Sequence, residues 1–255
     1  MADFSASSDR PAPVALVTGA SSGIGQAIAR TLAQEGYRMA LCARRRDRLE
    51  TLKDELAATG ADVLMHATDL RQESEILALF QTIRQTWGGV DVLINNAGLG
   101  RKAPLMSGET EAWREVLDVN VMALCICTRE AIQDMRQRGD RGHIIHISSL
   151  SGHRVPSTSG MYAASKFAVR ALAEGLRREL REANSQIRIS SVSPGLAETE
   201  FAEKYHASSA IAEEVYGRFP VLQPQDVANA IAYILSQPEH VQVQDVLVRS
   251  TYQAS

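Results

Sequence analysis

Short apolar runs recur along the chain, separated by longer stretches in which apolar residues return every three or four positions. A continuous apolar run that stops at a glycine or a charged residue is typical of a strand buried on both faces of a parallel sheet. On this basis the sequence predicts strands at residues 14–18, 38–42, 63–65, 90–94, 143–147, 186–192 and 241–248.

The stretches between these runs have the spacing of amphipathic helices. In the first of them Ile24, Ile28 and Leu32 share one helical face, and Gly36 marks the end. The same spacing predicts further helices at residues 47–59, 76–87, 109–138, 162–182 and 227–234.

Strands and helices therefore alternate, which predicts an α/β fold with a Rossmann-like, doubly wound parallel sheet. Since no Pro/Gly/Ser-rich linker divides the chain, we expect a single domain over residues 13–255. Residues 1–12 are predicted to be a disordered tail. Between residues 196 and 224 the periodicity fades, as in a substrate loop or lid.

Composition narrows the functional classes. The net charge of −3 and the lack of a basic stripe beyond Arg44-Arg45-Arg46 argue against a nucleic-acid-binding protein. No apolar run approaches the roughly 20 residues that would span a bilayer. Cys42, Cys125 and Cys127 have no disulfide-framework spacing, which favours reduced thiols and a cytoplasmic setting. The histidines and cysteines lack zinc-type spacing, so no metal site is predicted.

A glycine-rich segment, Thr18-Gly-Ala-Ser-Ser-Gly-Ile-Gly25, joins the first predicted strand to the first helix. In this context Gly19 permits a tight turn, Gly23 lets backbone amides approach a pyrophosphate, and Gly25 lets the helix pack on the sheet. The positive helix end then faces the phosphates, with Ser21, Ser22 and Ile24 beside them. A plain structural turn is the alternative, since the first gap is wider than in G-x-G-x-x-G.

The end of the second strand indicates which nucleotide binds. An acidic residue there bonds the ribose 2′-hydroxyl of NAD, whereas arginine accommodates the 2′-phosphate of NADP. Here Arg44 and Arg45 follow the strand and no acid occurs before Asp47, which favours NADP(H). The alternative is a solvated basic start to a charged helix.

Tyr162 and Lys166 lie four residues apart on a predicted helix, about one turn from each other. We expect the ammonium to lower the pKa of the tyrosine, and Ser149 to hold a carbonyl oxygen beside it. Such a group is an acid/base for a C–O centre and needs a separate hydride carrier. The spacing alone also occurs by chance, so its meaning depends on the nucleotide site.

Taken together, Thr18-Gly19-x3-Gly23-x-Gly25, Asn95-Asn96-Ala97-Gly98, Asn120, Ser149 and Tyr162-x3-Lys166 resemble the motifs of short-chain dehydrogenases/reductases. The resemblance implies that Tyr162 is the acid/base and that Lys166 lowers its pKa and binds the nicotinamide ribose. It also implies that Ser149 holds the substrate oxygen and that Asn120 anchors a water-linked proton relay. Alternatively, Asn120 is a polar residue satisfied within its own helix.

The resemblance implies further cofactor contacts along the chain. These are Asp69 and Leu70 by the adenine, Asn96, Ala97 and Gly98 by the adenosine ribose, and Pro194, Gly195 and Thr199 by the nicotinamide carboxamide. Asp69 could instead, or in addition, be an N-cap. The family also implies a homodimer or homotetramer.

The expected function is hydride transfer between NADP(H) and a small carbonyl or alcohol, either a ketone or a hydroxy acid. The family implies that the substrate pocket is lined by Leu99, Gly100, Arg101, His153, Arg154 and residues 201–206. Two alternatives stay open: a non-catalytic nicotinamide-nucleotide sensor, and an epimerase or dehydratase on the same fold.

Overall fold

The structure is a computed structural model that describes residues 11–156 and 159–254. The predicted tail, residues 1–12, therefore lies outside the described residues except for its last two. Within the described ranges, no helix has the length and apolar character needed to cross a membrane.

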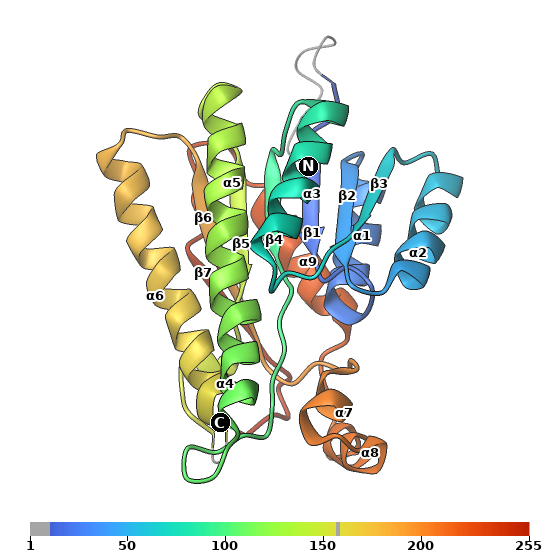
Figure 1. Cartoon of the computed structure of the whole chain (residues 1–255), viewed down its shortest axis with the longest axis vertical. Coiled ribbons are helices and arrows are strands. Elements are labelled where there is room, and N and C mark those ends of the chain that lie inside the picture. Colours follow the sequence, from blue (N-terminus) through green and yellow to red (C-terminus); the bar gives the residue numbers. More distant parts are fainter. Residues whose placement is uncertain (1–10, 157–158, 255) are drawn as a thin grey trace.

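A single parallel sheet runs through the described chain, with seven strands in the order β3-β2-β1-β4-β5-β6-β7 (Figure 1). The strands are β1 (Val14–Thr18), β2 (Arg38–Ala43), β3 (Val63–Ala67), β4 (Val92–Asn95), β5 (His143–Ile147), β6 (Arg188–Pro194) and β7 (Asp245–Val248). Leu16 of β1 pairs with Ala40 on one side and with Leu93 on the other. The strand order reverses beside β1, which confirms the predicted doubly wound α/β fold.

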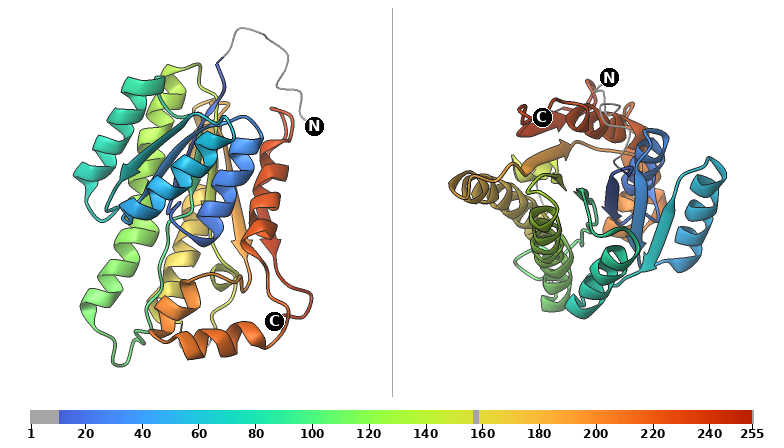
Figure 2. Two further views of the ribbon diagram at one scale, coloured as in Figure 1. Left: turned by 90° about the vertical axis from the view of Figure 1, so that its right-hand side faces the viewer. Right: turned by 90° about the horizontal axis from the view of Figure 1, so that it is seen from above.

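Helices cover both faces of this sheet (Figure 2). One face packs against α1 (Gly23–Gln34), α2 (Arg46–Ala58) and α9 (Pro224–Leu235). The other packs against α3 (Glu73–Trp87), α5 (Ala123–Gln137) and α6 (Gly160–Glu182). Both faces are therefore apolar, which explains why the strands read as continuous apolar runs.

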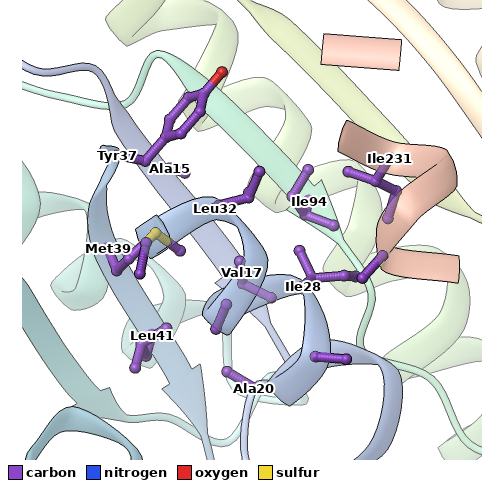
Figure 3. Close-up of a cluster of buried hydrophobic side chains, with 14 of the residues drawn as sticks. Ala15, Val17, Ala20, Ile28, Leu32, Tyr37, Met39, Leu41, Ile94 and Ile231 are labelled. Atoms are coloured by element: carbon purple, nitrogen blue, oxygen red, sulfur yellow. The ribbon is translucent and has the colours of Figure 1, made fainter. Parts of the chain in front are cut away.

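Side chains alternate between the two cores along β1. Ala15 and Val17 pack with α1, whereas Val14 and Leu16 pack on the opposite face. Figure 3 shows the first core, where Ile28 and Leu32 of α1 lie over Val17 and near Ile94 and Ile231. The residues that the sequence places four apart in the first helix thus lie on the buried face of α1.

The predicted helix 109–138 differs in detail from the structure. It consists of α4 (Thr110–Leu117), a π-helical segment (Asp118–Met122) and α5, which follow one another without a break. A π-helical turn keeps the chain helical, so a spacing that predicts one long helix does not distinguish the π-helical turn from the α-helix around it. The predicted last strand also begins later, at Asp245 rather than residue 241.

The segment 196–224, predicted to be irregular, contains two short helices. They are α7 (Phe201–His206) and α8 (Ser209–Gly217), which pack on each other beyond one end of the sheet (Figure 1). The side chain of Ser208 caps α8 by accepting from the amide of Ile211. Helices this short span too few turns for an apolar period to be recognised.

Candidate active site

A cleft of about 920 Å³ opens at the carboxyl edge of the sheet, where the strand order reverses between β1 and β4. Ligands of open α/β sheets bind at such a position. The predicted site residues that line this cleft are Gly19, Ser21, Ser22, Gly23, Ile24, Gly25, Arg44, Arg45, Asp69, Leu70, Asn96, Ala97, Gly98, Ser149, Tyr162, Lys166, Pro194, Gly195 and Thr199. Among the predicted catalytic and cofactor-binding residues, Asn120 alone does not line it.

Hydrogen bonds fix the ends of β1 and β4 to each other. The hydroxyl of Thr18 accepts from the amides of Asn96 and Ala97, each at 3.0 Å, and donates to the carbonyl of Ile94 at 3.3 Å. In return the Asn96 amide group donates to the Thr18 carbonyl at 2.8 Å. The floor of the cleft is therefore held in place without any ligand.

The glycine-rich turn has no room for side chains. A Cβ atom on Gly25 would lie 2.5 Å from both the Gly19 carbonyl oxygen and the Asn96 amide nitrogen. Gly19 and Gly23 have left-handed φ angles of 69° and 55°, and a Cβ on Gly23 would lie 2.9 Å from the Thr199 methyl. No side chain caps the start of α1, so its first amides are available to an anion. This geometry fits a pyrophosphate.

The two arginines after β2 have different environments. Arg44 is exposed at the cleft, whereas Arg45 is half-buried and bonded on several sides. Its guanidinium donates to the hydroxyls of Ser21 at 3.0 Å and Ser22 at 2.6 Å, and to the Glu200 carboxylate at 2.8 Å. Arg45 thus connects the glycine-rich turn to the residue that precedes α7.

Asp69 is not the N-cap of the next helix, because Gln72 occupies the N-cap position of α3. Its carboxylate instead pairs with Arg71 at 2.6 Å. Hydrogen bonds from Arg71, with a smaller contribution from the charge of Arg44, lower the pKa of Asp69. The carboxylate is therefore charged at the mouth of the cleft.

The candidate acid/base group lies at the start of α6. Burial raises the pKa of Tyr162 to about 12, and a hydrogen bond with Ser149 opposes this shift in part. Burial lowers the pKa of Lys166 to about 8. The Lys166 ammonium donates to the Ile147 carbonyl at 2.8 Å and lies 5.9 Å from the centroid of the Tyr162 ring. The expected lowering of the tyrosine pKa is therefore wrong for this structure, because burial disfavours both charged forms.

Asn120 lies in the π-helical segment behind the cleft, only 1% exposed. Its side-chain oxygen accepts from the Leu99 amide at 2.9 Å, and its amide group donates to the Leu99 carbonyl at 2.8 Å and the Ser165 hydroxyl at 2.9 Å. Its partners thus lie in the loop after β4 and on α6. The alternative, in which Asn120 is satisfied within its own helix, is wrong. Asn120 connects the loop after β4 to α6, one residue before Lys166.

Aromatic side chains of α7 lie over the candidate acid/base. The Phe201 ring is 5.1 Å from that of Tyr162, and the Tyr205 ring is 6.4 Å from it. Both α7 rings also contact Gly100, where a Cβ atom would lie within 2.8 Å of each ring. Both rings of α7 therefore pack against the Tyr162 ring.

Comparison with known proteins agrees with this geometry. The sequence model of the family described as short chain dehydrogenase matches residues 13–210. The chain belongs to the short-chain dehydrogenase/reductase family.

Two relatives and two solved structures show how far the similarity extends. Dehydrogenase/reductase SDR family member 11 of Gallus gallus is 50% identical over 95% of this chain and 97% of its own. Farnesol dehydrogenase of Aedes aegypti is 42% identical over 92% and 95%. A serine dehydrogenase in its closed form with NADP+ superposes with a TM-score of 0.89 at 31% identity, over 95% and 96% of the two chains. A short-chain dehydrogenase/reductase from Burkholderia phymatum in complex with NAD gives 0.84 at 28%, over 92% and 88%.

Membership of this oxidoreductase family supports dehydrogenase or reductase activity on a small molecule with a nicotinamide cofactor. The family fold also agrees with the observed sheet and its helices.

In this short-chain dehydrogenase/reductase the predicted substrate-pocket residues divide into two groups. Those that line the cleft are Leu99, Gly100, Arg101, Arg154, Phe201 and Lys204. The others do not, contrary to expectation: His153, Ala202, Glu203, Tyr205 and His206. The His153 ring hydrogen-bonds to the Ser193 hydroxyl at 2.9 Å on the β6 side, and the His206 ring packs edge-on against Tyr205 at 5.0 Å.

Sequence reasoning did not single out several residues of the cleft, and three of them make hydrogen bonds that shape it. Gln253 returns from the C-terminal segment, and its side-chain oxygen accepts from the Leu196 amide at 2.9 Å. The Tyr216 hydroxyl of α8 donates to the Thr199 carbonyl at 2.9 Å. Glu200 binds Arg45, as described above. Glu200 and Tyr216 lie in the segment 196–224, which the sequence predicted as a substrate loop, but none of the three residues stands in a local motif that would single it out.

Proposed function

We propose that this protein is an NADP(H)-dependent oxidoreductase that interconverts a carbonyl and an alcohol, with Tyr162 as the acid/base. One observation carries the proposal: Ser149, Tyr162 and Lys166 line the same cleft as the glycine-rich turn and Arg44. A hydride carrier and a proton donor would thus meet at one substrate carbon–oxygen bond.

The residues of the cleft fit a dinucleotide in an extended arrangement. The turn at Gly19–Gly25 and the start of α1 would hold the pyrophosphate, and Arg44, Arg45 and Ser21 would surround the 2′-phosphate. Asp69, Leu70 and Asn96–Gly98 would contact the adenosine, and Pro194, Gly195 and Thr199 the carboxamide. The bound nicotinamide supplies or accepts the hydride.

In the reduction, Tyr162 would donate its phenolic proton to the carbonyl oxygen. A pKa of about 12 keeps this hydroxyl protonated at neutral pH, as a donor must be. The Ser149 hydroxyl would donate to the same oxygen as negative charge develops on it. Lys166 would bind the ribose and return the proton to Tyr162 by way of a water near Asn120.

We propose a ketone, or the matching secondary alcohol or hydroxy acid, as the substrate. The cleft is lined by apolar side chains, such as Leu99, Val155 and Phe201, and by the exposed Arg154. The Phe201 ring lies 5.1 Å from that of Tyr162. The names of the relatives, from farnesol to serine dehydrogenase, span both apolar and carboxylate-bearing alcohols. The apolar residues would bind the carbon skeleton, and Arg154 would bind a carboxylate where one is present.

We further propose that residues 13–255 act as one domain in a homodimer or homotetramer. A reducing, cytoplasmic setting agrees with three free cysteines, of which Cys42 and Cys127 are buried in the sheet core.

The proposal is tested by following NADPH oxidation with a panel of aldehydes, ketones, keto acids and steroids, with NADH as the control. Tyr162→Phe should lower turnover about 10³-fold, the usual scale of a lost acid/base, while NADPH binding stays within about twofold. Tyr233→Phe is the matched control, because Tyr233 is exposed on α9 away from the cleft.

Near-normal turnover in Tyr162→Phe would contradict the mechanism, and a preference for NADH would contradict the role of Arg44. NADPH binding with no activity across the whole panel would instead favour the nucleotide sensor.

A further inference from the structure

The segment after β7 returns to the nicotinamide end of the proposed cofactor site. Gln253 lines the cleft together with Pro194, Gly195 and Thr199, although it follows the last strand of the sheet. Its side chain lies on the Gly195 backbone, where an added Cβ atom would collide with the side-chain oxygen. A residue 57 positions after Leu196 thus forms part of the wall at which the nicotinamide is proposed to bind.

Within the described chain, three hydrogen bonds hold the backbone of Gly195 and Leu196. The Gly195 amide donates to the Val248 carbonyl at 2.7 Å, and the Leu196 carbonyl accepts from the Leu222 amide at 3.0 Å. The third bond runs from the Leu196 amide to the side-chain oxygen of Gln253, at 2.9 Å. The first two join backbone to backbone and do not depend on side chains. The Gln253 bond is therefore the one that the amino-acid type controls.

A turn presents Gln253 to this backbone. The Gln253 amide donates to the Ser250 carbonyl at 3.1 Å, and the Tyr252 amide donates to the Ser250 hydroxyl at 3.2 Å. The Ser250 hydroxyl in turn donates to the Pro220 carbonyl. Because the turn is fixed, Gln253 loses little freedom when it bonds the Leu196 amide. The bond also sets the direction of the side-chain amide, since only its oxygen accepts from an N–H.

We propose that Gln253 is a positioning residue for the nicotinamide: by accepting from the Leu196 amide, it fixes the peptide against which the ring is placed for hydride transfer. The inference rests on the proposed nicotinamide contacts of Pro194, Gly195 and Thr199. Without this acceptor the half-buried Leu196 amide has to turn toward solvent, because an unbonded N–H is costly, and the peptide shifts with it. Hydride transfer is sensitive to such a shift, since a misplacement of about 1 Å can cost a factor of about 100 in rate.

The test separates the two halves of the cofactor with two ligands, NADPH and 2′,5′-ADP, of which the second lacks the nicotinamide. Dissociation constants are measured by calorimetry for the wild type and three variants. Gln253→Met keeps the length of the side chain and removes the acceptor, whereas Gln253→Glu keeps an acceptor oxygen. Gln242→Met is the matched control: the Gln242 side chain also bonds a backbone group, the Ile189 carbonyl at 3.0 Å, but does not line the cleft.

Gln253→Met should weaken NADPH binding about five- to tenfold, the scale of one lost hydrogen bond, and leave 2′,5′-ADP binding within about twofold of the wild type. Gln253→Glu should restore NADPH binding to within about threefold, because the reduced nicotinamide is uncharged and the acceptor is present. Gln242→Met should leave both ligands within about twofold. The fluorescence of bound NADPH gives a second readout without turnover: in Gln253→Met its emission maximum should lie closer to that of free NADPH.

The outcomes separate this inference from the proposed function. A wild type that binds 2′,5′-ADP as tightly as NADPH would overturn the nicotinamide contacts, and the inference with them. A wild type that prefers NADPH, with a Gln253→Met variant that keeps the full preference, would overturn the inference alone. Equal losses of affinity for both ligands in Gln253→Met would also overturn it, because Gln253 would then support the fold in general. The same holds if Gln253→Glu binds NADPH as weakly as Gln253→Met.

Discussion

The glycine-rich turn and helix α7 face each other across one cleft, but different forces hold them. The turn is fixed by close backbone packing and by the Thr18–Asn96 hydrogen bonds between neighbouring strands. Helix α7 has six residues, less than two turns, and is held by partly exposed ion pairs of Glu200 and by ring contacts.

The difference shows which half of the cleft is preformed. Contacts through buried backbone cannot change without disrupting the sheet, so the nucleotide side keeps its shape with or without a ligand. Partly exposed ion pairs are weak and exchangeable, so the α7 side is free to adjust. A rigid side suits a cofactor whose shape is constant, and an adjustable side suits substrates whose shape varies.

The largest expected effect comes from adding a methyl group inside the turn. Gly25→Ala should destabilise the protein by about 3 kcal/mol and abolish NADPH binding, because its Cβ meets a backbone carbonyl at 2.5 Å. Gly217→Ala is the matched control, a helical glycine of α8 with no atom within 4 Å of the added Cβ. It should change stability by less than about 1 kcal/mol, and in the stabilising direction. Urea unfolding measures the stability of the two variants, and NADPH titration measures their cofactor binding. Equal effects of the two variants would contradict the view that the glycine-rich turn is the more rigid side of the cleft.

An intermediate effect is expected from pH, through two histidines of β5. Burial lowers the pKa of His143 and of His146 from 6.5 to about 3. Each contributes stability that is fully present above pH 6.5, where it is neutral in both states, and that is lost as the pH falls toward 3. The slope is up to about 1.4 kcal/mol per pH unit for each histidine. The contribution of Glu200 has a lower window: it is present above 4.5 and lost as the pH falls toward 2.

Acid should therefore weaken the sheet before it releases α7. Urea unfolding between pH 8 and pH 5 should show falling stability, and His143→Gln should flatten the curve. His240→Gln, at an exposed position after α9, should leave the curve unchanged. A wild-type stability that stays constant over this range would contradict the burial argument.

The smallest effect is expected at α7. Phe201→Ala removes the ring beside Tyr162 and should raise the KM of the carbonyl substrate a few-fold while kcat changes little. Stability should fall by less than about 1 kcal/mol, since the side chain is half-buried. Phe80→Ala, in the fully buried core of α3, should cost about 3–5 kcal/mol. A similar loss of stability in both variants would show that α7 belongs to the rigid part of the protein.

The sequence by itself determined the sheet, its flanking helices and most of the cleft. Apolar runs such as Val14–Thr18 indicate a strand that is buried on two faces. The glycines at positions 19, 23 and 25 indicate a turn that has no room for a Cβ atom. Tyr162 and Lys166 are brought together by one turn of a helix. These are local constraints, so a local pattern records them.

Only the tertiary structure decided which polar groups meet across the fold. Arg45 and Glu200 are 155 positions apart, and Leu196 and Gln253 are 57 apart. It also gave Asn120 its partners, and burial rather than the neighbouring lysine set the pKa of Tyr162. An arginine or a carboxylate has the same local signature whichever partner it binds. Pairing and burial depend on where distant segments pack, which no short stretch of sequence specifies.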